Sequence, residues 1–252
     1  MRAAGQILLL QCPLGEMTMR KNQYGNALWL ILLAVFLLGA LTVLLTRGAS
    51  NTEETGESEK LRVEATKLLR FTSSVPIAVQ RMLQNGVSEN ELSFANTFYQ
   101  RCDDTPSNVT NPICTRPECQ IFDTQGGGLK PVETPTALYD NPYTCGWFKH
   151  GSIDTKVINI MGVGTTAADL VLEVYWLNKQ ACLMLNKLSG VDNPGGDPPA
   201  ENETTFCAFT GDYNCATETF GDDAPEVAGK KNFCTYRASD DAYFFHTVIL
   251  AR

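Results

Sequence analysis

Residues 59–84 read EKLRVEATKLLRFTSSVPIAVQRMLQ, and this stretch decides how the rest of the chain folds. Apolar side chains recur in it at helical spacing with charged ones between them, which predicts an amphipathic helix with one apolar face. The apolar positions are Leu61, Ala65, Leu68, Leu69, Val75, Val79, Met82 and Leu83. Pro76 should kink or interrupt this helix. Asn85-Gly86 is a good stop signal for it.

The segment that follows alternates short strand-like runs with loops. The runs rich in β-branched and aromatic residues are Leu92–Phe98, Cys119–Phe122, Thr144–Phe148, Lys156–Gly162, Asp169–Trp176 and Tyr243–Leu250. Asn178–Leu188 predicts a second helix with Gly190 beyond its end, and 103–118, 124–143 and 189–232 are expected to be ordered loops. The sequence therefore predicts an α+β domain over 59–252, in which the amphipathic helix packs on an antiparallel sheet and disulfides hold the loops.

An uninterrupted apolar run lies upstream of that helix. Ala27–Thr46 reads ALWLILLAVFLLGALTVLLT, without a charge or a proline, and a helix of this length is expected to cross a bilayer. Arg20 and Lys21 precede the run and four glutamates follow it, which predicts a cytoplasmic N-terminus. The expected organisation is a leader at 1–25, a transmembrane helix at 26–47, a polar junction at 48–58 and an extracytoplasmic domain at 59–252. We thus expect a single-pass inner-membrane protein with a periplasmic or extracellular C-terminal domain.

The cysteines agree with that compartment. Eight of the nine follow the apolar run, and an even number of them is typical of disulfides formed in an oxidising environment. They are Cys102, Cys114, Cys119, Cys145, Cys182, Cys207, Cys215 and Cys234. The spacing of the cysteines alone does not determine which of them pair in disulfides. Short loops close most readily and favour Cys102–Cys114, Cys119–Cys145 and Cys207–Cys215, which leaves Cys182–Cys234.

The amino-acid composition limits the classes of molecule that the protein is expected to bind. The formal net charge of the 252 residues is −8, and no stripe of lysines or arginines occurs. Binding to nucleic acid requires such clustered positive charge, so nucleic acid is not an expected partner. The hydrophobic fraction of 44% and the charged fraction of 19% are those of a folded protein rather than a disordered one.

The N-terminal pattern resembles that of type IV pilins and pseudopilins. From Met19 the chain reads MRKNQYG and then NALWLILLAVF, a short basic leader and a glycine directly before the apolar helix. The resemblance implies that a peptidase cuts between Gly25 and Asn26 and that the apolar helix packs inside a filament. The family usually has Phe and Glu at the first and fifth mature positions, where this chain has Asn26 and Leu30. That departure fits a minor pseudopilin or an uncleaved anchor better than a major filament subunit.

A second resemblance covers most of the chain. The leader end at 25–28, the loop Asn193-Pro-Gly-Gly-Asp-Pro-Pro199 and the final run 243–252 are similar to those of uncharacterised pilin-like bacterial membrane proteins. This likeness implies a location and an architecture, and it brings no activity with it. The partners it implies are the lipid bilayer and other pilin-like subunits or envelope proteins.

Catalytic signals are weak throughout the sequence. Gly162-Val-Gly164 follows a strand-like run, but another strand-like run comes next, where a dinucleotide site needs a helix. A tight turn between strands explains the glycines. The two histidines, His150 and His246, have no partner constellation in the sequence and are expected to be structural or surface groups. We expect no enzyme activity and no cofactor.

An acidic loop offers one weak metal candidate. Asp222, Asp223 and Glu226 lie close together in 218–226, and calcium prefers several carboxylate oxygens, although the spacing is not that of an EF-hand. A solvated acidic loop is the favoured interpretation. The function that the sequence favours is a pilin-like structural or assembly subunit of a bacterial filament, pseudopilus or secretion-type envelope complex. The alternative is a permanently anchored binding module without catalysis.

Overall fold

The computed structural model describes residues 24–108, 110–139, 149, 151–202, 207–215 and 218–252, with only the backbone at 24–28, 41 and 43–55. The chain divides into two compact units, Met1–Thr55 and Gly56–Arg252. The predicted strand Thr144–Phe148, Cys145 and His150 lie outside the described residues.

The helix α1 runs from Tyr24 to Gln84 as one element of 61 residues and ends where Asn85-Gly86 predicts a stop. Pro76 lies inside α1 and does not interrupt it. Helical structure also continues through 48–58, so the expected polar junction is not a break.

The predicted transmembrane helix over 26–47 is wrong as an element of this fold. Among the residues that the structure describes, no helix combines the length and the apolar character that a membrane crossing requires. The apolar run is instead the beginning of α1, a much longer helix of mixed polarity.

A five-stranded sheet forms the centre of Gly56–Arg252, with the strand order β3-β1-β2-β5-β4. The strands are β1 (Ile153–Ile160), β2 (Asp169–Leu177), β3 (Thr219–Phe220), β4 (Asn232–Arg237) and β5 (Ala242–Leu250). β1, β2, β5 and β4 pair antiparallel, whereas β3 runs parallel to β1. The sheet is therefore mixed: the predicted antiparallel pairing is present in β1, β2, β5 and β4, and only the β3 edge is parallel.

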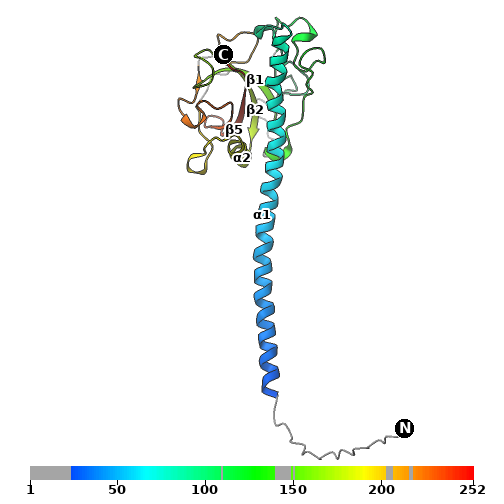
Figure 1. The fold of residues 1–252 in the computed structure, drawn as a ribbon, viewed down its shortest axis with the longest axis vertical. Coiled ribbons are helices and arrows are strands. Elements are labelled where there is room, and N and C mark those ends of the chain that lie inside the picture. The colour runs from blue at the N-terminus through cyan, green and yellow to red at the C-terminus, as the bar shows by residue number, and fades with distance from the viewer. Residues whose placement is uncertain (1–23, 109, 140–148, 150, 203–206, 216–217) are drawn as a thin grey trace, which may run out of the picture. The chain divides into compact units, whose positions relative to one another are not determined.

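The main core lies between this sheet and the end of α1. Leu68, Val75 and Val79 of α1 are at most 2% exposed and share one apolar cluster with side chains such as Leu172 and Phe245 on the sheet. Figure 1 shows this part of α1 lying alongside β1 and β2. We call this side of the sheet the helix face. Helical spacing on α1 thus produces the apolar stripe that covers the helix face.

The opposite side of the sheet, the far face, is covered by the segment between α2 and β4. Val191 and Val227 of that segment share an apolar cluster with Ile160 and Val171 of the sheet. Alternation along each strand sends successive side chains to the two faces. Because these described residues lie over the far face, apolar side chains on both faces of the sheet are buried.

The second helix, α2, spans Lys179–Ser189 and begins at a capped position. The Asn178 side chain accepts a hydrogen bond from the Ala181 N–H at 2.7 Å, and Gly190 follows the helix in the left-handed region with φ of 69°. Short 3₁₀ turns complete the described elements at Glu89–Glu91, Pro117–Cys119, Thr136–Leu138, Pro194–Gly196 and Pro225–Val227.

Two of the predicted strands do not form β-strands with regular backbone pairing. Leu92–Phe98 and Cys119–Phe122 meet only through an isolated bridge between Ser93 and Gln120. Leu92 and Phe94 are buried in the core, so their apolar character reflects packing rather than strand pairing. By contrast, Gly162 and Gly164 take positive φ in the turn between β1 and β2, as a turn between strands requires.

Candidate functional site

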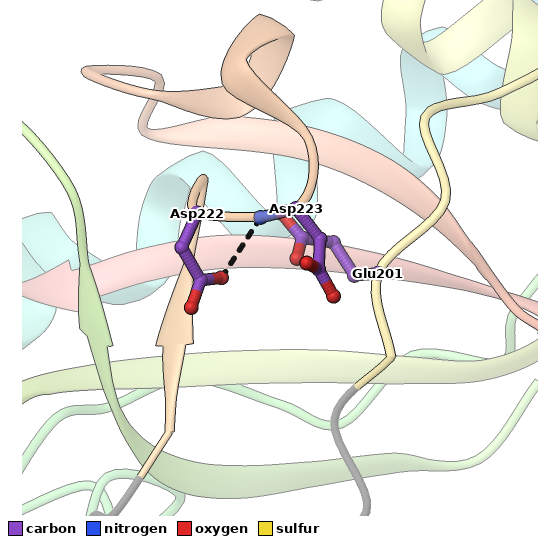
Figure 2. A group of neighbouring side chains, drawn as sticks. All are labelled: Glu201, Asp222 and Asp223. Carbon is purple, nitrogen blue, oxygen red and sulfur yellow. Dashed lines mark hydrogen bonds between the residues drawn. The ribbon is translucent and has the colours of Figure 1, made fainter.

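Three carboxyl groups lie close together in the domain, those of Glu201, Asp222 and Asp223 (Figure 2). Each residue offers one oxygen, and these oxygens lie within 4.8 Å of one another. Glu201 is fully buried, whereas Asp222 and Asp223 are exposed. Glu201 thus forms the buried floor of the group.

Backbone contacts bring these residues together from distant parts of the chain. The Glu201 N–H donates to the Tyr236 carbonyl at the β4 edge, and Oε1 of Glu201 accepts from the Gly221 N–H at 2.7 Å. Asp222 and Asp223 follow Gly221, whose φ of +96° turns the chain directly after β3. The Asp223 N–H in turn donates to Oδ1 of Asp222 at 3.0 Å, the dashed line in Figure 2.

A hard divalent cation fits this donor set, because calcium binds carboxylate oxygens at about 2.3–2.6 Å and tolerates irregular geometry. Of the predicted residues, Asp222 and Asp223 belong to the group. Glu226 does not, since it lies in the turn Pro225–Val227, and Glu201 stands in its place. The group remains a geometric candidate, because acidic side chains also cluster at protein surfaces without an ion.

A second group, which the sequence did not indicate, is a row of charged side chains buried on the far face. Asp154 of β1 lies opposite Glu173 of β2, and Glu173 lies opposite His246 of β5. Lys156 contacts Asp154 at 3.1 Å and Arg237 contacts Glu173 at 3.0 Å, each with at most 4% of the side chain exposed. Alternation would have placed these charges toward water, yet all four are buried.

The electrostatics of this charged row follow from burial and pairing. Burial is the largest single influence and raises the pKa of Glu173, but its neighbours, Arg237 foremost among them, together outweigh burial and hold the pKa of Glu173 below its ordinary value. Burial lowers the pKa of His246 to about 4, against the pull of Glu173. His246 is therefore neutral near pH 7, while Glu173 is an anion there.

Three members of this region are arranged in the order nucleophile, base and acid. The Thr235 hydroxyl lies 3.1 Å from Nε2 of His246, and Nδ1 of His246 lies 3.9 Å from Glu173. The second distance exceeds a hydrogen bond, and Thr235 and His246 are at most 2% exposed. The rings of Phe220 and Phe233 also pack against the imidazole. The geometry favours a structural role for His246 over acyl transfer.

Disulfides join six of the described cysteines in three pairs, Cys114–Cys119, Cys182–Cys234 and Cys207–Cys215. Cys102 is disulfide-bonded as well. The predicted pairs Cys102–Cys114 and Cys119–Cys145 are wrong, because Cys114 and Cys119 bond to each other. The turn at Pro117–Cys119 folds the chain back so that their Cα atoms lie 5.7 Å apart despite a separation of five residues.

Loop length predicts unequal effects for two of these disulfides. Replacing both Cys182 and Cys234 by Ala opens a covalent loop whose ends are 52 residues apart. The loop closed by Cys114–Cys119 has ends only five residues apart. Loop-closure entropy gives losses in unfolding free energy of about 4 and about 2 kcal/mol respectively. Urea unfolding of the two double variants measures the difference. Equal losses would show that closure of the unfolded chain does not set the contribution of these bonds.

The predicted processing residues lie at the start of α1. Gly25 and Asn26 are its second and third residues, so the expected cut falls within the first helical turn. The preceding leader residues lie outside the described part of the chain.

Comparison of the chain with protein-family models, with curated proteins and with solved structures finds no match.

Proposed function

We propose that this chain is a pilin-like structural or assembly subunit of a bacterial filament, pseudopilus or envelope complex, and that it does not act by catalysis. The observation that carries the proposal is the contrast between the two parts of α1. The later part is built into the core of a folded domain, whereas the early part presents large apolar side chains that nothing in the described chain covers.

The early part of α1 is apolar on all sides. Its large apolar side chains are between 41% and 75% exposed, and they are Trp29, Leu30, Ile31, Leu32, Leu33, Val35, Phe36, Leu37 and Leu38. A helix that is apolar all round requires an apolar environment, because such a surface is unfavourable in water. In the proposed assembly the same segment of other subunits supplies that environment. We call Trp29–Leu38 the assembly segment.

The disulfides support an extracytoplasmic place for the domain. Three bonds connect six described cysteines, and bonds of this kind persist in oxidising compartments. A subunit of an envelope complex would carry its folded domain in such a compartment. A formal net charge of −8 further argues against a role on nucleic acid.

Photo-cross-linking in the native cell envelope tests this proposal. A benzoylphenylalanine at Phe36, which is 75% exposed, should cross-link to the assembly segment of another subunit. The same probe at Phe98, an exposed phenylalanine of the domain, serves as the matched control and should not give this product. Mass spectrometry of the cross-linked peptides identifies the partner. Cross-links from Phe36 that never reach another protein would contradict the proposal.

The N-terminus of the assembled protein provides a second measurement. We expect a mature chain that begins at Asn26, because the basic leader, Gly25 and the apolar run together specify that cut. A Gly25→Val variant should keep its leader and fail to assemble, while the domain still folds. An intact leader in assembled wild-type protein would favour the alternative, an anchored interaction module.

A further inference from the structure

A groove of about 330 Å³ lies between α1 and the β4–β5 edge of the sheet, wholly within Gly56–Arg252. Such a volume is at the lower end of the range of about 300–1,000 Å³ that ligand pockets occupy. It is lined by the polar or charged residues Ser73, Gln80, Lys231, Asn232 and Thr247 and by the apolar residues Pro76, Val248, Ile249 and Ala251. The groove shares no residue with the acidic group.

Two buried polar atoms at this groove have no hydrogen-bond partner among the described residues. They are the hydroxyl oxygen of Thr247 and Oδ1 of Asn232, and these two residues lie opposite each other on β5 and β4. Thr247 is only 2% exposed. A buried polar group without a partner is unfavourable by about 1–3 kcal/mol, so native proteins rarely retain one without a reason. A ligand that bonds to both atoms would supply that reason.

The opposite wall does not satisfy these atoms. Ser73, Pro76 and Gln80 are three and four residues apart and therefore line one face of α1. Pro76, in the middle of the three, has no backbone N–H to donate. Ser73 and Gln80 are exposed, so their polar groups stand at the mouth of the groove. A ligand between the two walls could bond to both.

The groove does not suit an extended peptide. Peptide addition to a sheet requires a run of free backbone groups on an edge strand. On β4, the Asn186 side chain already bonds to both backbone groups of Cys234, at 2.7 and 2.9 Å. The Tyr236 N–H donates to Pro199, and its carbonyl accepts from Glu201. Polar recognition in the groove therefore falls to the side-chain hydroxyl, amide and ammonium groups that line it.

We propose that this groove binds a small anionic saccharide, a sugar ring that carries a carboxylate. Hydroxyl and amide side chains both donate and accept, as sugar hydroxyls do, and no carboxylate lines the groove. Thr247 and Asn232 bond to ring hydroxyls, while the exposed ammonium of Lys231 pairs with the carboxylate. This inference is independent of how the chain assembles.

Saturation-transfer NMR on the full-length protein in a zwitterionic detergent tests the site, with D-glucuronate as the probe. Glucuronate should bind, D-glucose should bind more weakly, and acetate should give no signal. Thr247→Val should weaken glucuronate binding by about three- to tenfold, the effect of one neutral hydrogen bond. Lys231→Gln should weaken glucuronate and leave glucose unchanged. Lys187→Gln, an exposed lysine on α2, is the matched control and should change neither.

The melting temperature of Thr247→Val provides an internal check. Because the hydroxyl has no partner, its removal should leave the melting temperature unchanged or raise it. A clear fall would mean that the hydroxyl is already satisfied, and the site would lose its main support. Absence of binding by glucuronate and glucose to the well-folded wild-type protein would overturn the proposal.

Discussion

A chain that begins at Val87 should aggregate, whereas one that begins at Glu57 should fold as a cooperative unit. The difference between them is the part of α1 that covers the helix face of the sheet. Its buried members are Ala65, Leu68, Val75, Ala78, Val79 and Met82, all at most 4% exposed. Each large apolar side chain contributes about 1.5–3 kcal/mol on burial, and their sum is comparable with the whole stability of a domain, about 5–15 kcal/mol.

The measurement is a pair of thermal melts with size-exclusion profiles, after production in an oxidising compartment. The longer chain should elute as a discrete species, because Gly56–Arg252 is already one compact unit. The shorter chain should expose the helix face and self-associate. If both were equally stable and monodisperse, α1 would not be part of the core and the proposed architecture would lose its basis.

Point variants on the same helix separate packing from helix formation. Leu68→Ala removes a side chain that is 2% exposed and should lower the unfolding free energy by about 2–5 kcal/mol. Ile77→Ala removes one that is 71% exposed and should change it by less than about 0.5 kcal/mol. Similar losses for the two would mean that helix propensity, rather than burial, governs this part of α1.

The elements that the sequence predicts well are those whose signal is local. The amphipathic stripe of 59–84 and its stop at Asn85-Gly86 agree with the end of α1 at Gln84. Asn178 and Gly190 mark the two ends of α2. Strands β1, β2 and β5 lie within one to three residues of the predicted ends of their β-branched runs. In each case, spacing or capping within a dozen residues determines the structure.

The elements that sequence patterns do not predict depend on contacts with residues far away in the chain. β4 reads NFCTYR, a short run that follows a predicted loop, and it becomes a strand because β5 pairs with it. The two-residue β3 exists only through its pairing with β1. Glu201 joins Asp222 and Asp223 through backbone contacts to Tyr236 and Gly221. No short stretch of sequence specifies these strand pairings and side-chain contacts.

The charged row on the far face shows the same limit in energetic terms. Lys156 and Glu173 alternate with apolar neighbours, as side chains on a solvated face do. Both are nevertheless buried on the far face, which residues of the expected loop 189–232, such as Val191 and Val227, cover through contacts with neighbouring apolar side chains. Without that covering contact the charges would face water, and no property of the strands themselves distinguishes the two outcomes.

Arg237→Met should therefore lower the unfolding free energy by about 3–5 kcal/mol at pH 7, because it leaves the buried carboxylate of Glu173 without its main partner. Arg237 lies 3.0 Å from Glu173 and 3.1 Å from Asp240, and its guanidinium stacks over the Phe244 ring. Methionine retains much of the side-chain volume, so the loss measures charge more than packing. Urea unfolding gives the value.

The matched control is Arg116→Met. Arg116 forms an ion pair with Glu91 at 3.2 Å, nearly the same distance, but its side chain is 46% exposed. Exposed pairs contribute about 0–1 kcal/mol, so this variant should be almost as stable as the wild type. Equal losses in the two variants would show that burial does not determine the effect. The double variant Arg237→Met with Glu173→Gln should recover part of the loss, since the unpaired charge is gone.

The pH dependence of the Arg237→Met deficit distinguishes an unpaired charge from lost packing. In the wild type, the neighbours of Glu173 together hold its pKa below the ordinary value, and Arg237 contributes most among them. Without Arg237, burial should raise that pKa. A carboxyl whose folded-state pKa is raised binds a proton more readily in the folded than in the unfolded state, so stability falls as the pH rises through that window. The deficit of the variant relative to the wild type should therefore shrink from pH 8 to pH 5. A deficit that stays constant over this range would assign the loss of stability to the packing of Arg237 on Phe244. Arg237 would then stabilise the fold by its packing rather than by its charge.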